Sequence, residues 1–408
     1  MLNYLSNKSF LILLSCIITL FTSRQSLGQE LEKVSIQLNW FHQYQFAGYY
    51  AAKEKGFYRE LGLDVELRER NEVGSIEDHI IAGEADYGIN DSSLIVAKNK
   101  GKPVVIVAQI FQHSPTTIAT LRSSGIASPF DLIGKRIMVG KEWKKFAPIT
   151  AMLMQAEQDM SAFNWQEKSD HLGTLTRGET DAILIYNTNE PFYFKQDNID
   201  IFTISPRDYG IDFYGDNLFT SELEVKNNPQ RVQAIRQATI KGWQYAINHQ
   251  AEIIKLIEDK YNSQNKSHRH LTFEANEINK IILAKFIPLG SIARTRMEKI
   301  SEIYHQLGMT DSPFIPENLL LEDALINFSS EKNSLDDSTT LIVMMILISL
   351  MLIFSTLLLP KLISQQRIAA FMASRKFPFI VHSISALNIA IIFSVIYLTL
   401  QDNEKITR

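Results

Sequence analysis

The sequence predicts an α/β protein with two doubly wound halves, exported from the cytoplasm and followed by two transmembrane helices. Three observations support this. Strand and helix patterns alternate over residues 34–108, a similar alternation begins again near residue 126, and long apolar runs lie at both ends of the chain. Strand–helix alternation at this spacing is typical of a parallel sheet with helices on both faces.

The composition excludes several classes of protein. The chain has 408 residues, of which 45% are hydrophobic and 21% charged, as in ordinary globular proteins. A net charge of −4 without a Lys/Arg-rich block argues against a nucleic-acid partner. A single cysteine excludes a disulfide scaffold and a cysteine-based metal site.

Residues 1–28 have the features of a secretory signal. Lys8 provides the positive start, residues 10–21 form an apolar run, and Ser26-Leu27-Gly28 offers small residues for cleavage. The apolar run is too short to cross a hydrocarbon core of about 30 Å as a helix. An uncleaved anchor, or lipidation at Cys16, is an alternative that places the following domain on the same side of the membrane.

The C-terminal part predicts two transmembrane helices. Residues 340–359 and 377–400 contain no Asp, Glu, Lys or Arg, and each run is long enough to span a bilayer. The loop at 361–376 carries basic but no acidic residues, so the positive-inside rule makes it cytoplasmic. We therefore expect a protein of the inner (cytoplasmic) membrane, with residues 29–338 in the periplasm and residues 311–338 acting as a tether.

The first half begins with a period-two strand, in which Val34, Ile36 and Leu38 alternate with polar residues. A helix over residues 48–55 is expected to end at Gly56. The remaining elements expected here are a strand at 65–67, a helix capped by Ser75, a strand at 86–90, a helix beginning at 91–93 and a buried parallel strand at 104–108.

The second half repeats this pattern. Strands are expected at 137–139 and 182–185, and residues 178–181 form a helix-to-strand turn that matches residues 83–86 of the first half. From Pro229 onward the sequence predicts mainly helix. A helical face that packs on the first half is expected to contain Val232, Ile235, Thr239 and Trp243.

No catalytic motif is present. The chain has no Walker loop, no Gly-x-Gly-x-x-Gly, no His-Glu-x-x-His and no Gly-x-Ser-x-Gly sequence, and its nine histidines are scattered. The sequence proposes no nucleophile held beside a base, which an enzyme would need. We therefore expect no enzymatic activity, no catalytic residue, no metal and no cofactor.

Aromatic, amide and carboxylate side chains follow the predicted strands, where ligands bind in parallel α/β sheets. Planar rings beside hydrogen-bonding groups suit a small, flat, polar heteroaromatic ligand, and each stacked ring contributes about 1–3 kcal/mol. Core packing of the aromatic rings, and helix capping by Asp91, Ser92 and Glu190, are the alternatives. The candidates are Asn39, Trp40, Asp91, Ser92, Tyr186, Glu190, Tyr209, Tyr214 and Asp216.

A longer pattern resembles a known family. It begins at Leu38-Asn39-Trp40, continues through residues 47–58 and 62–65, and extends in order to Gly242-Trp243. Over residues 33–310 the chain resembles the type II periplasmic binding proteins that carry thiamine-pyrimidine precursors, relatives of sulfonate and taurine binders. The segments 111–115 and 209–216 are most similar to versions fused to membrane-bound histidine kinases or diguanylate cyclases.

The resemblance implies a two-lobed type II periplasmic-binding-protein fold with a ligand between the lobes. Lobe 1 would comprise residues 31–115 and 217–310, and lobe 2 residues 116–216. The resemblance assigns the ligand first to Asn39, Trp40, Tyr186 and Glu190, and then to the segment 209–216, and it also places Phe46 at a ligand-binding position. Phe46 matches the histidine of a pyrimidine-synthesising eukaryotic enzyme of this family, whose cysteine cluster also has no counterpart here, so binding is implied rather than synthesis.

Two functions from different classes remain open. The leading hypothesis is a membrane-anchored sensor, in which lobe closure on a pyrimidine-like ligand moves the tether and the transmembrane helices. We expect such a sensor either to be part of a longer chain or to signal through a partner, such as a histidine kinase or a diguanylate cyclase. The alternative is a membrane-tethered component of an ABC importer for a thiamine precursor or a sulfonate, with a permease as partner.

Overall fold

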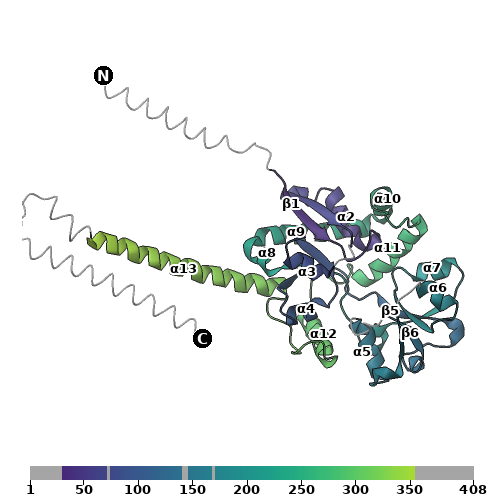
Figure 1. The fold of residues 1–408 in the computed structure, drawn as a ribbon. Coiled ribbons are helices and arrows are strands. Elements are labelled where there is room, and N and C mark those ends of the chain that lie inside the picture. The colour runs from purple at the N-terminus through teal and green to yellow at the C-terminus, as the bar shows by residue number, and fades with distance from the viewer. Residues whose placement is uncertain (1–29, 71–73, 140–145, 168–170, 354–408) are drawn as a thin grey trace, which may run out of the picture. The chain divides into compact units, whose positions relative to one another are not determined.

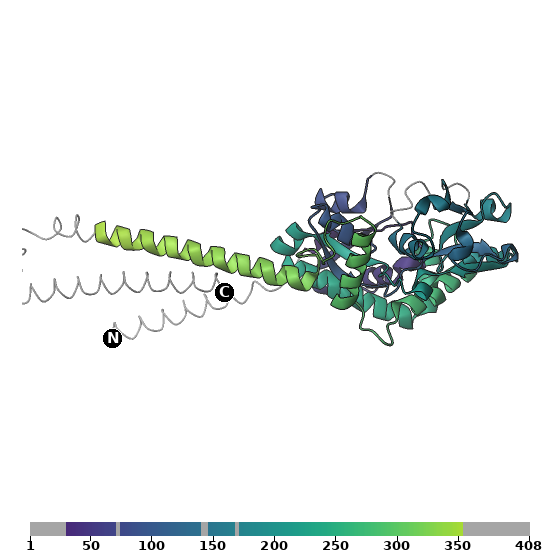
Figure 2. The same cartoon turned by 90° about the horizontal axis from the view of Figure 1, so that it is seen from below.

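Two five-stranded sheets form the centres of two lobes (Figures 1 and 2). The computed structural model describes residues 30–70, 74–139, 146–167 and 171–353. The strands of lobe 1, in sheet order, are β2 (Leu63–Arg68), β1 (Glu32–Gln37), β3 (Tyr87–Asn90), β10 (Asn217–Ser221) and β4 (Val104–Gln109). Those of lobe 2 are β7 (Asn164–Gln166), β6 (Arg136–Met138), β8 (Ala182–Tyr186), β5 (Thr116–Leu121) and β9 (Ile201–Ile204).

Helices connect and cover these strands. In chain order the α-helices are α2 (Ala47–Glu54), α3 (Ile76–Ile81), α4 (Leu94–Asn99), α5 (Ala147–Ala156), α6 (His171–Thr176), α7 (Pro191–Gln196), α8 (Glu222–Asn227), α9 (Pro229–Asn248), α10 (Gln250–Lys260), α11 (His268–Ile282), α12 (Arg294–Gln306) and α13 (Leu321–Ile353). Short 3₁₀ turns lie at η1 (Tyr44–Phe46), η2 (Arg59–Leu61), η3 (Arg122–Ser124), η4 (Phe130–Leu132), η6 (Met160–Ala162) and η7 (Pro206–Tyr209).

The local signals in the sequence agree with these elements. The Ser75 side chain caps α3 by accepting a hydrogen bond from Asp78 N, as expected. Gly83 and Gly178, in the two matching turns, both adopt positive φ angles, of 73° and 69°. Such angles are strained for residues with a Cβ atom, which explains why glycine recurs at the same point of each half.

The parallel sheets expected from the alternation are confirmed only in part. In lobe 1, β1, β2 and β3 run parallel, but β10 is antiparallel to β3 and β4. In lobe 2, β6, β7 and β8 run parallel, but β5 is antiparallel to β8 and β9. The reason is the path of the chain. β5 and β10 each directly follow a crossing between the lobes, so each enters its sheet from the edge at which the parallel strands end.

The apolar strand β4 is buried, as expected, although it lies at the end of its sheet. Its free edge is covered by later parts of the chain. Ile106 N donates to Leu319 O at 2.7 Å, and Gln109 forms an isolated bridge with Gly290. Covering an edge strand in this way removes a template for aggregation.

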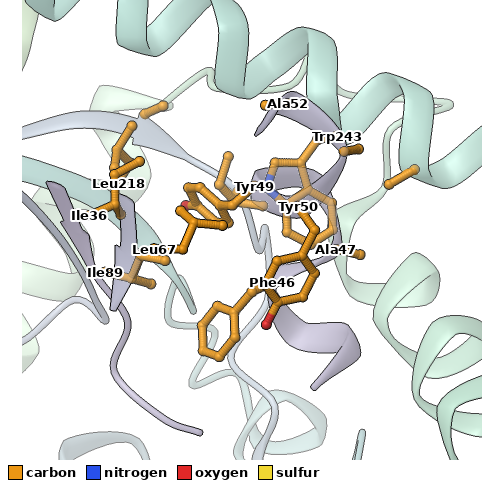
Figure 3. Packing of buried hydrophobic residues seen from close by; sticks show 14 of the residues in the cluster. Ile36, Phe46, Ala47, Tyr49, Tyr50, Ala52, Leu67, Ile89, Leu218 and Trp243 are labelled. Atoms are coloured by element: carbon orange, nitrogen blue, oxygen red, sulfur yellow. The ribbon is translucent and has the colours of Figure 1, made fainter. Parts of the chain in front are cut away.

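Helices α2 and α9 meet on one side of the lobe 1 sheet, where the Trp243 ring lies beside α2 (Figure 3). The helices approach closely because two glycines face the contact. A Cβ atom on Gly48 would lie 2.1 Å from Trp243 Cγ, and one on Gly242 would lie 2.1 Å from Gly48 O. Trp243 is fully buried, with its ring centroid 6.0 Å from that of Phe111 in the crossing to lobe 2.

Helix α13 begins within the core of lobe 1. Leu321 and Ala324 are buried, and the Arg294 side chain forms an ion pair with Asp323. Residues 319–324, within the segment 311–338 that is expected to be a tether, therefore belong to the first unit, where Leu319 bonds to the β4 edge. The chain divides after Ser329 into a second unit that contains the rest of α13.

Several expectations fall on residues outside the described ranges. These are the signal at 1–28, the whole run at 377–400 with its preceding loop, and residues 354–359 of the first expected transmembrane run. Within the residues that are described, no helix is both long enough and apolar enough to cross a membrane.

The glycine contact between α2 and α9 gives a test of the packing. We expect Gly242→Ala to lower the free energy of unfolding by about 1–3 kcal/mol or more, because the added methyl group would overlap the α2 backbone. Urea unfolding followed by tryptophan fluorescence measures the change. Gln244→Ala, on the exposed face of α9, is the matched control. A Gly242→Ala variant as stable as this control would contradict the packing described.

Candidate ligand-binding site

A cavity of about 470 Å³ lies between the lobes, at the edge where the parallel strands of both sheets end. Lobe 1 contributes residues that follow β1, β2 and β3, and lobe 2 contributes residues that follow β6 and β8. The lining residues are Asn39, Trp40, Gln43, Gln45, Arg70, Gly74, Ser75, Ile76, Glu77, Asn90, Met138, Val139, Phe146, Leu184, Ile185, Tyr186, Asn189 and Glu190. A volume of this size holds a small organic molecule.

Trp40 and Asn39 come directly after β1 and line the lobe 1 side of the cavity. The Trp40 ring is partly buried and meets the edge of Phe41, with centroids 5.7 Å apart. The guanidinium carbon of Arg70 lies 5.1 Å from the Trp40 ring centroid, within cation–π range. Trp40 is therefore held between neighbours while it still lines the cavity.

A buried amide–carboxyl network fixes the orientation of Asn39. Asn39 Nδ2 donates to Asp216 Oδ1 at 3.2 Å, and Gln45 Nε2 donates to both Asn39 Oδ1 and Asp216 Oδ2. Burial raises the pKa of Asp216 to about 7, although the hydrogen bonds from Gln45 and Asn39 favour the charged form. Asp216 thus acts behind the cavity wall, as a partner of a lining residue.

Tyr186 and Glu190 line the lobe 2 side, where β8 ends and α7 begins. Tyr186 N donates to Glu190 Oε2 at 2.9 Å, so the carboxylate also secures the turn between strand and helix. Glu190 occupies the N-cap position of α7, but its side chain accepts no hydrogen bond from the helix, so its carboxylate is used by the strand end and the cavity wall. The pKa of the Tyr186 phenol is raised, first by burial and then by the nearby carboxyls of Asp91, Asp216 and Glu190.

A second carboxylate, Glu77, lines the cavity from lobe 1. It lies in the first turn of α3 and is buried, and Asn90 Nδ2 donates to its Oε1 at 2.6 Å. Among the described lining residues Arg70 is the sole cation, and the carboxylates are Glu77 and Glu190. The cavity therefore favours a ligand that presents hydrogen-bond donors or a positive charge over an anion.

The structure brings four of the ten predicted residues to the cavity: Asn39, Trp40, Tyr186 and Glu190. Phe46 is not among the lining residues, and this expectation needs correction. Its side chain is fully buried in the core of lobe 1, because η1 turns it toward the sheet (Figure 3). The position gives no direct contact with a ligand in this cavity.

The other predicted residues stabilise the structure around the cavity. Asp91 Oδ1 accepts from Ser93 N at 2.8 Å, and Ser92 Oγ donates to Tyr214 O at 3.0 Å. Tyr214 is buried and its hydroxyl accepts from Ala293 N. Asp91, Ser92, Tyr209 and Tyr214 are all absent from the lining, since local turns and core contacts use their side chains.

Sequence patterns predict the remaining lining residues only weakly. Glu77 follows the Ser75 cap, where an acid is expected for helix stability alone. Asn189 precedes Glu190 in the segment expected at a strand end. The hydrogen-bond partners of its side chain, Lys266 and His270, lie far away in the sequence. Arg70 lies after the end of β2, outside any periodic pattern, so the pattern of apolar residues does not predict that it lines the cavity.

A second hollow of about 360 Å³ lies over β1, β2 and the end of α2. Most of its lining is charged, and it contains no aromatic side chain: Lys33, Lys53, Asp64, Glu66, Arg68 and Asp86 contribute to it. Several of these groups already have partners, such as Arg68 with Glu66. It lacks the rings that a flat ligand needs, so we assign the ligand to the cavity between the lobes.

No group of three or more His, Cys, Asp or Glu side chains is placed to hold a metal ion within the described ranges. The lining residues that the structure describes include no histidine, lysine or cysteine. The described wall therefore offers hydrogen bonds, stacking surfaces and carboxylate charge.

Comparison with known proteins agrees with this architecture. The formylaminopyrimidine-binding protein of Halalkalibacterium halodurans is 24% identical over 328 residues, which are 78% of this chain and 98% of that protein. The 4-amino-5-hydroxymethyl-2-methylpyrimidine phosphate synthase of Legionella pneumophila is 29% identical over 123 residues, covering 30% of this chain and 39% of the synthase.

Solved structures share the fold. The periplasmic sulfonate-binding protein SsuA of Methylobacillus flagellatus superimposes with a TM-score of 0.56 at 18% identity, covering 75% of this chain and 96% of that one. The two-sheet architecture is thus that of periplasmic binding proteins. A family model described as NMT1/THI5 like matches residues 43–253, which is just over half of the 408 residues. The chain therefore belongs to the NMT1/THI5-like family.

Proposed function

We propose that the protein is an extracytoplasmic solute-binding protein for a small, flat, amine-bearing heteroaromatic molecule of the thiamine-pyrimidine type. One observation carries the proposal. Both lobes supply aromatic rings and a carboxylate to a single cavity: Trp40 and Glu77 come from lobe 1, and Tyr186, Phe146 and Glu190 come from lobe 2. The binding of formylaminopyrimidine named for the H. halodurans relative agrees with this ligand class.

The charge of the wall separates this ligand class from sulfonates. An anion would meet Glu77 and Glu190, while Arg70 is the sole cation among the described lining residues. A ring amine or a protonated ring nitrogen would instead form charge-assisted hydrogen bonds with the carboxylates, each contributing about 1.5–3 kcal/mol. Likeness to sulfonate binders at 18% identity concerns the fold alone.

We propose binding without chemical change. The synthases of the family match only a quarter to a third of this chain, including the Legionella enzyme at 30%. The described lining residues do not pair a nucleophile with a base, and no lysine or histidine is available there for covalent chemistry.

We further propose that the protein is anchored in the cytoplasmic membrane and signals. The supporting observation is that α13 starts at the buried Leu321 of lobe 1 and ends at Ile353, within the uncharged run at 340–359. A sensor needs a continuous connection of this kind between its binding lobe and the membrane. A tethered importer component, with a permease as partner, needs only an anchor.

A binding series tests the ligand class. Calorimetry of the full-length chain is expected to show binding of hydroxymethylpyrimidine or its formylamino precursor and none of taurine. Trp40→Ala, Glu77→Gln and Glu190→Gln are each expected to weaken binding tenfold or more, a loss of about 1.4 kcal/mol. Asp64→Asn and Phe130→Ala, both exposed and outside the cavity, are the controls. Binding of taurine alone would refute the heteroaromatic assignment.

A protection assay tests the topology. Protease added to intact bacterial spheroplasts that express the chain is expected to digest residues 29–338 and to spare the loop at 361–376, because the basic loop stays in the cytoplasm. Antibodies to a tag in each segment report the result. Protection of the large segment in intact spheroplasts, with digestion after lysis, would show that the topology is wrong.

A further inference from the structure

A buried polar cluster joins the two lobes beside the cavity. Lys266 and Glu274, both in lobe 1, form an ion pair with Nζ and Oε1 2.6 Å apart, and their side chains are 1% and 2% exposed. Lys266 Nζ also donates to Asn189 Oδ1 of lobe 2 at 2.6 Å. Glu274 Oε2 accepts from Tyr44 N at 2.9 Å, which completes the cluster on the lobe 1 side.

Stability alone is a poor explanation for this cluster. Removing a lysine and a glutamate from water costs several kcal/mol per ion, and apolar residues of similar size often stabilise a core as well or better. Apolar residues could supply neither the acceptor for Tyr44 N nor the hydrogen bond from Lys266 to Asn189, and of these two contacts only the second crosses between the lobes. The placement of this buried cation therefore points to a role at the lobe boundary.

His270 makes a second bond to the same oxygen. Its Nε2 lies 2.9 Å from Asn189 Oδ1, and its ring stacks on Phe192 of α7, with centroids 4.3 Å apart and planes 9° from parallel. The neighbouring α11 and α7 are visible in Figure 1. Burial, and then the charge of Lys266, lower the pKa of His270 to about 3, so the neutral ring donates its Nε2 proton to Asn189.

Two donors on one oxygen fix the orientation of the Asn189 amide. Oδ1 is used by lobe 1, and the amide NH₂ makes no hydrogen bond with the described protein residues. Asn189 also lines the cavity, next to the carboxylate of Glu190. A donor beside an acceptor is complementary to a ring nitrogen beside an exocyclic amine, the edge that an aminopyrimidine presents.

We infer that Asn189 is a ligand-binding residue whose amide donor is positioned by Lys266 and His270 from the opposite lobe. Opening the cleft would break both bonds and release the donor, so ligand affinity and lobe closure depend on the same side chain. Lys266, Glu274 and His270 act as positioning residues. The inference rests on the proposed function, which supplies the ligand class.

Two variants test separately the Asn189 amide donor and the residues that position it. Asn189→Asp keeps an oxygen for Lys266 and His270 but loses the NH₂ donor. Lys266→Met combined with Glu274→Gln removes the charges, retains an acceptor for Tyr44 N, and leaves Asn189 without its lysine bond. The matched control is Lys280→Met with Glu277→Gln, an exposed ion pair on the same helix, with Nζ and Oε1 2.7 Å apart.

Calorimetry with hydroxymethylpyrimidine on the full-length chain is the first measurement. We expect Asn189→Asp to bind tenfold or more weakly. We expect the Lys266/Glu274 double variant to lose affinity while its melting temperature stays level or rises, a combination that a purely stabilising pair would not give. Wild-type affinity in either variant, or a loss of affinity in the control as large as in the buried pair, would overturn the inference.

Lobe closure is measured separately, without ligand. Spin labels at Arg59→Cys in lobe 1 and Lys195→Cys in lobe 2, both exposed, report the distance distribution after Cys16→Ser removes the native thiol. Asn189→Ala is expected to shift this distribution to longer distances, and an unchanged distribution would refute the interlobe bonds. If the wild type binds no pyrimidine, both the proposed function and the ligand-binding role of Asn189 are wrong. The spin-label distances still test whether Asn189 bonds to Lys266 and His270 across the lobes.

Discussion

The whole site depends on the two segments that cross between the sheets and bond to each other. Ser114 N donates to Phe213 O at 2.8 Å, and Ile110 N donates to Asp216 O at 3.0 Å, so the outgoing segment at 110–115 is tied to the returning one. This pair of crossings brings the ends of the parallel strands of both sheets to one cavity. It also places the Asp216 carboxyl behind Asn39, where it orients a lining residue.

Much of the fold could be predicted from the sequence because it follows from local patterns. Period-two strands, the Ser75 cap and the glycine turns at Gly83 and Gly178 depend on neighbouring residues, and the structure contains them. The antiparallel strands β5 and β10 depend instead on where the chain crosses between lobes, which no local pattern encodes. The packing of residues 319–321 on β4 is equally non-local, and a tether was expected there.

The site could be predicted to a smaller extent. Residues at or near the end of a strand, such as Trp40 and Tyr186, could be predicted from the rule that ligands lie beyond strand ends. Phe46 and Tyr214 carry the same residue types, but their burial is decided by the turn of η1 and by contacts with α12, which lie beyond that rule. Asn189 gains its proposed role from partners about 80 residues later in the chain.

A crystal structure of the chain with hydroxymethylpyrimidine tests the central claim most directly. The proposal predicts the ring between Trp40 and Tyr186, with its amine at a carboxylate of Glu77 or Glu190 and both lobes in contact with it. A ligand held at another surface, or a cleft that stays closed without admitting the ring, would contradict the claim that both lobes grip a flat molecule at the ends of their parallel strands.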